Sequence, residues 1–67
     1  MPIINVQLLI GRTAEQKRAL IRELAEGAMR ALDAPEASIR VLLTEVEPEH
    51  WGIGTESKAD QNKRGTT

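Results

Sequence analysis

Cysteine is absent from this chain of 67 residues, and histidine occurs only once. The sequence therefore has no disulfide framework, and it lacks the Cys and His ligands from which most zinc sites are built. Lysine and arginine number 9 against 10 aspartates and glutamates, so the net charge of −1 gives no attraction to nucleic acid or to an anionic membrane. We expect no metal site, no nucleic-acid partner and no membrane partner.

Long hydrophobic runs are also missing, since none approaches the roughly 20 residues of a membrane-spanning helix. The first residues lack the basic, apolar and small-residue segments that together make a secretory signal peptide. We therefore expect a cytoplasmic protein.

Aromatic residues are reduced to one, Trp51, so the core must be aliphatic. Aromatic side chains are favoured at interfaces and in ligand pockets, and Trp51 is expected to cover a subunit seam or to line a pocket. A chain of this length buries only roughly 60% of its unfolded surface and usually needs a staple or a partner. Without disulfides or metal, oligomerisation is the remaining way to build a sufficient core.

Three segments of regular structure can be predicted from the apolar periodicity. Residues 2–10 and 38–46 alternate as strands, whereas residues 14–32 repeat apolar positions at helical spacing, with Lys17 on the polar side. Thr13 is a good helix N-cap, and Gln16 three residues later completes a capping box. A strand, a helix and a strand of these lengths form a right-handed βαβ unit whose two strands are parallel. The predicted fold class is α/β.

The rest of the chain completes this unit. Residues 47–50 are predicted to form a turn, and the glycines of 51–54 indicate a short C-terminal hairpin. Residues 58–67 are polar and are predicted to be a disordered tail, so the domain spans residues 1–57. Both strands carry apolar residues on both faces, which implies that a second layer covers the sheet. We expect two chains to form a four-stranded sheet, and such dimers to pack further.

Pro2 is the residue with the most distinctive chemistry, because removal of Met1 leaves it as a free secondary amine. Such an amine ordinarily titrates near pH 8, and nearby cations lower its pKa toward the range of an effective general base. Arg12 and Arg40 are the candidate cations, and each can also form a bidentate pair with a carboxylate. The alternatives stay open: Pro2 also suits the first residue of a strand, Arg12 also suits solvent, and Arg40 also suits an interface ion pair.

Several short motifs recur together in one known family. They are Met1-Pro2-Ile3, Gly11-Arg12-Thr13, Glu15-Gln16-Lys17, Leu20-Ile21-Arg22-Glu23, Leu32-Asp33-Ala34-Pro35, Ser38-Ile39-Arg40-Val41, Thr44-Glu45 and Trp51-Gly52-Ile53-Gly54. Through them the chain resembles 4-oxalocrotonate tautomerase, the short-subunit branch of the tautomerase superfamily, from the start to about Glu56.

The resemblance implies an isomerase that uses no cofactor. Pro2 moves a proton from the enol oxygen side of a substrate such as 2-hydroxymuconate to a carbon atom. The product is an unsaturated 2-oxo acid. It implies that Arg40 binds one carboxylate-bearing end of the substrate and draws electron density toward it, and that Arg12 holds the distal carboxylate. Trp51, where the family usually has phenylalanine, belongs to the hydrophobic wall, and Leu9 lines the site. It also implies a homohexamer, a trimer of dimers, with sites built from more than one chain; a hetero-oligomer stays open.

Other functions fit the same scaffold. A dehalogenase or hydratase needs a water-activating carboxylate near Trp51, and Ile53 occupies the most suitable place. A biosynthetic tautomerase acting on a different enol is a further alternative. A non-catalytic oligomeric module is the reading if Met1 is retained, because Pro2 is then an amide.

Overall fold

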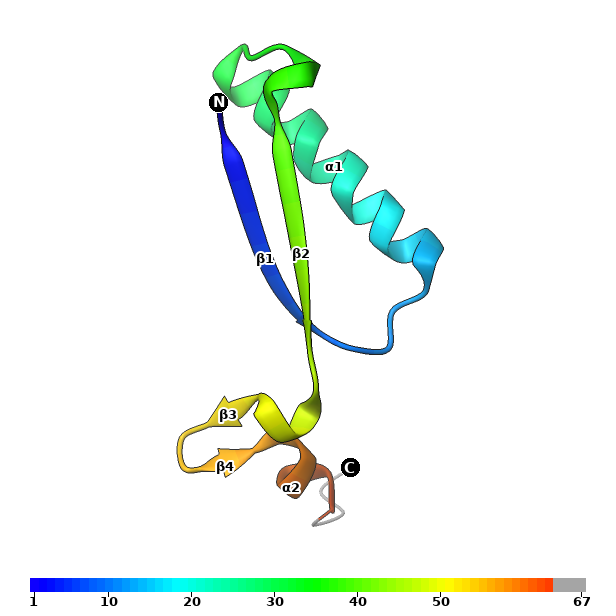
Figure 1. Ribbon diagram of the computed structural model, residues 1–67, viewed down its shortest axis with the longest axis vertical. Helices are drawn as coiled ribbons and strands as arrows, with labels where there is room; N and C mark the ends of the chain where they lie inside the picture. Colours follow the sequence, from blue (N-terminus) through cyan, green and yellow to red (C-terminus); the bar gives the residue numbers. More distant parts are fainter. Residues whose placement is uncertain (64–67) are drawn as a thin grey trace.

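The computed structural model describes residues 1–63 and has the predicted order of strand, helix and strand (Figure 1). Strands β1 (Ile3–Leu9) and β2 (Arg40–Val46) are parallel, with Ile3 opposite Arg40 and Leu9 opposite Val46. Helix α1 (Ala14–Leu32) connects the two strands. The βαβ prediction is confirmed, and the helix has the predicted bounds.

The start of α1 is set by the predicted capping box. The backbone N–H of Gln16 donates to Thr13 Oγ1, and the backbone N–H of Thr13 donates to Gln16 Oε1, both at 3.0 Å. These reciprocal bonds satisfy amides that the first helical turn leaves without partners. At the other end, Asp33 ends the helix in the left-handed conformation (φ 54°).

The two faces of the β1–β2 sheet differ in how well the chain covers them. Side chains of Ile4, Val6 and Leu8 are half-buried beneath α1, as alternation along a strand predicts. On the opposite face Ile3 is 59% exposed and Leu42 is 49% exposed. This open face carries the apolar residues for which the sequence predicts a second layer.

A short 3₁₀ turn precedes β2. The turn η1 (Glu36–Ser38) is held by the N–H of Ser38 and by Ser38 Oγ, which both donate to the carbonyl of Pro35 at 3.0 and 2.8 Å. The predicted strand start at residue 38 is therefore wrong by two residues. The hydroxyl of Ser38 favours this local turn over strand pairing.

The C-terminal residues form a small unit of their own at the far end of β2 (Figure 1). It contains the 3₁₀ turn η2 (Pro48–His50) and the predicted hairpin of β3 (Gly52–Ile53) and β4 (Glu56–Ser57). Gly54, at the hairpin turn, has the positive φ of 64° that favours glycine.

Helix α2 (Lys58–Lys63) follows, where a disordered tail was predicted. That prediction is wrong for residues 58–63, because Ser57 Oγ accepts from the N–H of Asp60 (3.1 Å) and caps the helix. The last part of the predicted tail, residues 64–67, lies outside the described residues.

The chain does not close on itself. Its extents are 46 × 24 × 15 Å and its radius of gyration is 15.5 Å, whereas a compact domain of this length has a radius near 11 Å by chain-length scaling. Within residues 1–63, Ile39 is the only hydrophobic side chain classed as buried, at 9% exposure. So open an arrangement is consistent with the oligomer predicted from the sequence, in which neighbouring chains complete the core.

Candidate active site

Pro2 lies half-buried immediately before β1, at the end of the sheet where β2 begins. The backbone N–H of Arg40 donates to its carbonyl oxygen (N···O 3.1 Å). The guanidinium of Arg40 turns back toward η1, where Nη1 donates to the carbonyls of Ala37 (2.7 Å) and Ile39 (3.1 Å). The sheet pairing thus brings together two of the predicted site residues, Pro2 and Arg40.

Arg12 lies at the opposite end of the sheet, on the short loop between β1 and α1. Gly11 before it has a φ of 121°, a conformation that side chains with a Cβ rarely adopt. Ile10 is tied to β2, because its N–H donates to the carbonyl of Val46 (3.1 Å), and Thr13 is tied to α1 by the capping box. Arg12 is therefore presented by a loop whose two ends are both fixed.

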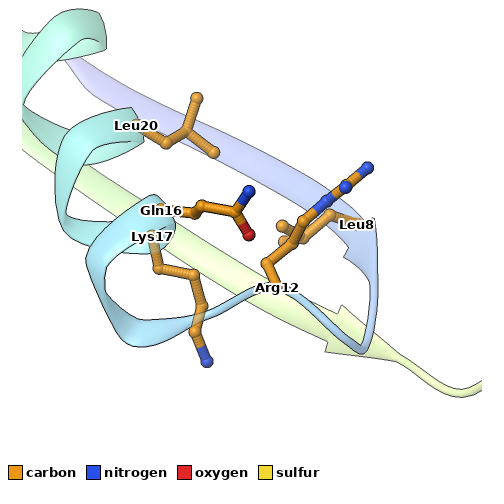
Figure 2. Close-up of a pocket in the computed structure, with 5 residues that line it drawn as sticks. All are labelled: Leu8, Arg12, Gln16, Lys17 and Leu20. Atoms are coloured by element: carbon orange, nitrogen blue, oxygen red, sulfur yellow. The ribbon is translucent and has the colours of Figure 1, made fainter.

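A hollow of about 240 Å³ opens beside this loop and is shown in Figure 2. Its apolar sides come from Leu8 and Leu20, and its polar groups come from Arg12, Gln16 and Lys17. A cationic, partly apolar hollow of this kind suits an organic anion. A second hollow of about 440 Å³ lies along the outer side of α1 and contains none of the predicted site residues.

Lys17, one of the residues that line the hollow, forms an ion pair with Glu45, with Nζ and Oε2 3.1 Å apart. The bond joins the first turns of α1 to the last residues of β2 across 28 positions of sequence. The placement of Lys17 on the polar side of the helix was wrong, because its side chain is half-buried toward β2. Its spacing of three and seven residues from Leu20 and Leu24 is the signal that could have found it.

Trp51 follows the same end of β2, after η2. Its N–H donates to the carbonyl of Pro48 (3.3 Å), and its own carbonyl accepts from the N–H of Lys58 at the start of α2 (2.7 Å). Leu9 pairs with Val46 at the end of the sheet. By strand alternation from Ile3, the side chain of Leu9 belongs to the open face and not to the hollow beside Arg12.

The five predicted site residues thus fall into two groups in one chain. Pro2 and Arg40 share one end of the sheet, whereas Arg12, Leu9 and Trp51 lie toward the other. Seven residues of β1 separate the two ends, a span of about 20 Å at the usual rise of a strand. A site that contains both Pro2 and Arg12 therefore takes them from different chains.

Across residues 1–63, no group of three or more His, Cys, Asp or Glu side chains is placed to hold a metal ion. No helix in that range is both long and apolar enough to cross a membrane.

Comparison with known proteins gives consistent matches. Residues 2–61 match the family model described as "Tautomerase enzyme". The chain is 53% identical over 57 residues to a 2-hydroxymuconate tautomerase from Stutzerimonas stutzeri, covering 85% of this chain and 90% of that protein.

Solved structures agree with the sequence matches. The fold resembles TomN, a 4-oxalocrotonate tautomerase homologue in the tomaymycin biosynthetic pathway, with a TM-score of 0.90 at 35% identity over 92% of this chain and 95% of that chain. It also resembles a heterohexameric 4-oxalocrotonate tautomerase from Chloroflexus aurantiacus, with a TM-score of 0.85 at 40% identity over 90% and 97% of the two chains.

Proposed function

The chain belongs to the tautomerase family and is an isomerase of that family, and we propose that it converts 2-hydroxymuconate or a related 2-hydroxydienoate to the conjugated 2-oxo acid. The observation that carries this proposal is the family match, which begins at Pro2 and runs to residue 61. The 53% identical relative bears the name of the same reaction. We place the reaction in the breakdown of aromatic compounds.

Pro2 is the proposed proton carrier, as the amine left by removal of Met1. Its nitrogen accepts the proton of the 2-hydroxyl, the electrons of that O–H bond form the C=O double bond, and the conjugated double bond shifts. The same nitrogen then donates the proton to a carbon atom of the substrate, so atoms and charge balance without any redox step. A base with a pKa near the working pH is effective in both directions of this transfer.

The two arginines are proposed to bind the two ends of the substrate. Arg40 lies at the Pro2 end of its chain, and its two hydrogen bonds both use Nη1, which leaves Nε and Nη2 as donors for a carboxylate and the developing oxyanion. Arg12 has no hydrogen-bond or ion-pair partner among residues 1–63. It is therefore available to a distal carboxylate, with Trp51 and Leu9 as the apolar wall.

The proposed assembly is a hexamer built as a trimer of dimers. It is supported by the open sheet face, by the elongated chain and by the separation of Pro2 from Arg12. The Chloroflexus relative is described as a heterohexamer, so assembly with a sister subunit is the alternative to a homohexamer.

A biosynthetic enol is the second candidate substrate, and the likeness to TomN favours it. The two candidates differ in the acid at the far end of the substrate. If Arg12 binds a second carboxylate, the protein should turn over 2-hydroxymuconate well. If the substrate is a biosynthetic enol without a second carboxylate, turnover of 2-hydroxymuconate should be poor.

The test is ketonisation of 2-hydroxymuconate followed by ultraviolet absorbance, with intact mass confirming loss of Met1. Pro2→Ala is expected to lower kcat by at least about 10²-fold, the usual contribution of a positioned base. A form that retains one residue before Pro2 serves as the second variant, because its amide nitrogen carries no basic lone pair. Activity that survives both changes contradicts the proposal and favours the non-catalytic module or another chemistry.

A further inference from the structure

The geometry points to Lys17 and Glu45 as positioning residues for Arg12: their ion pair fixes the loop that carries Arg12, so that its guanidinium can hold the distal carboxylate of the substrate. The inference rests on the role proposed above for Arg12. Neither residue is among the site residues predicted from the sequence, and neither needs to touch the substrate.

The Lys17–Glu45 ion pair is better shielded from solvent than the ion pair of Arg22 with Glu23. The side chains of Lys17 and Glu45 are 31% and 36% exposed, and their charged atoms are 3.1 Å apart. Arg22 and Glu23 are 61% and 68% exposed, and their charged atoms are 3.9 Å apart on neighbouring residues of α1. Only the first pair joins two elements, so only its loss can change how α1 sits on the sheet.

The loop that carries Arg12 takes its position from the elements on either side of it. Ile10 is bonded to Val46, the residue after Glu45, and the carbonyl of Thr13 accepts from the N–H of Lys17 (3.0 Å). The Lys17–Glu45 bond closes a ring that runs along β2, through the loop and back through the first turn of α1. Arg12 lies on the loop part of this ring, so the ring limits how far its backbone can move.

The directions of the side chains separate positioning from direct binding. In Figure 2 the amine of Lys17 points away from the guanidinium of Arg12, on the other side of the loop. The amine is also occupied by the Glu45 carboxylate. Although Lys17 lines the hollow, its amine is paired with Glu45 and directed away from Arg12, so it acts as a positioning residue and not as a second ligand for the anion.

The experiment measures KM and kcat for two substrates, 2-hydroxymuconate and a 2-hydroxydienoate that lacks the distal carboxylate. Lys17→Met and Glu45→Gln are each expected to raise KM for the dicarboxylate roughly tenfold with a smaller change in kcat, because small misplacements of a binding group have effects of this size. KM for the monocarboxylate is expected to stay unchanged. Glu23→Gln, an isosteric change in the exposed pair, is the matched control and should leave both substrates unaffected.

The two single variants distinguish positioning from simple charge. If the residues acted only through the field at Arg12, Lys17→Met would weaken anion binding and Glu45→Gln would strengthen it. Positioning predicts that both weaken it, and that the charge-swapped double variant Lys17→Glu, Glu45→Lys restores KM to within about threefold. Opposite signs, or equal losses with both substrates, would overturn the inference.

Binding of adipate, an unreactive dicarboxylate with six carbons, separates this inference from the proposed function. If the wild-type protein turns over neither substrate, the proposed function fails, and calorimetric titration with adipate then decides the inference alone. A Kd raised about tenfold in both single variants supports it. Wild-type protein that does not bind adipate, or variants that bind it as well as the wild type, overturn it.

Discussion

The two ends of the β1–β2 sheet hold different kinds of functional group. At one end Pro2 and Arg40 are joined through the backbone, with the carbonyl of Pro2 accepting from the N–H of Arg40. At the other end Arg12 is held by a capped helix start and by the cross-element ion pair of Lys17 with Glu45. The first end carries the proposed proton transfer and one of the two arginines proposed to bind the substrate, and the second end carries the other arginine.

One chain therefore carries all the residues of the proposed site but does not bring them together. A span of about 20 Å between the ends is longer than a six-carbon dicarboxylic acid. Opposite ends can meet when chains pack with rotational symmetry, because an antiparallel neighbour places its second end beside the first end of its partner. Assembly is therefore a condition for the proposed chemistry as well as for the core.

The largest effect is expected at the first end, from Arg40→Ala. The guanidinium is proposed to stabilise charge that develops on the 2-oxo group, and removal of such a donor costs about 10²- to 10³-fold in kcat. Steady-state ketonisation of 2-hydroxymuconate measures the change. Arg40→Lys, which keeps the charge and loses the fork, should recover only part of the rate.

The control for this variant is Arg30→Ala, an exposed arginine on α1. Circular dichroism and native mass check the fold, because Arg40 also donates to the carbonyls of Ala37 and Ile39. A folded, assembled Arg40→Ala protein with a wild-type rate contradicts the assignment of Arg40 to the site.

The second prediction tests whether each site combines Pro2 of one chain with Arg12 of a neighbouring chain. Pro2→Ala and Arg12→Ala are each expected to be nearly inactive, but a refolded equimolar mixture should regain about a quarter of the wild-type activity. A site is intact when an intact Pro2 (chance about one half) meets a neighbour's intact Arg12 (about one half). Native mass should show about 44 kDa for six chains of 7.4 kDa.

A mixture that stays inactive contradicts this arrangement, provided that mass spectrometry detects mixed oligomers. In that case Pro2 and Arg12 act in one chain, and the proposed roles of the two ends must change. The double variant Pro2→Ala, Arg12→Ala mixed with Arg12→Ala protein is the matched control, because no chain in that mixture carries an intact Arg12 and activity should not return.

Much of the fold could be predicted because it depends on local signals. Apolar alternation, helical periodicity and the Thr13–Gln16 capping box predicted β1, α1 and β2 with small errors at the strand ends. Helix α2 was missed because its residues are polar and carry no apolar stripe. The pattern Ser57-x-x-Asp60 was the available signal, since a serine followed three residues later by an acid is a helix start.

The site could be predicted only in part, because its residues are related through space. The types Pro2, Arg12 and Arg40 indicate chemistry, and the predicted strand 2–10 already separates Pro2 from Arg12. The sequence does not report the strand register that pairs Ile3 with Arg40. The Lys17–Glu45 bond spans 28 residues and depends on how α1 crosses the sheet. Pairs of this kind become visible only when the elements are placed in three dimensions.

The smallest effect is expected from loss of a helix cap, Thr13→Ala at the start of α1 or Ser57→Ala at the start of α2. Loss of the Thr13 cap should lower the free energy of unfolding by about 1 kcal/mol per chain, because α1 is left with unsatisfied amides at its start. Loss of the Ser57 cap should cost less than half as much, because α2 has only six residues and loosens locally before the chain unfolds. Urea unfolding at one fixed protein concentration is the measurement, since assembly makes stability depend on concentration. Equal losses from the two variants would mean that α2 unfolds together with the βαβ unit, and that the C-terminal residues belong to its cooperative core.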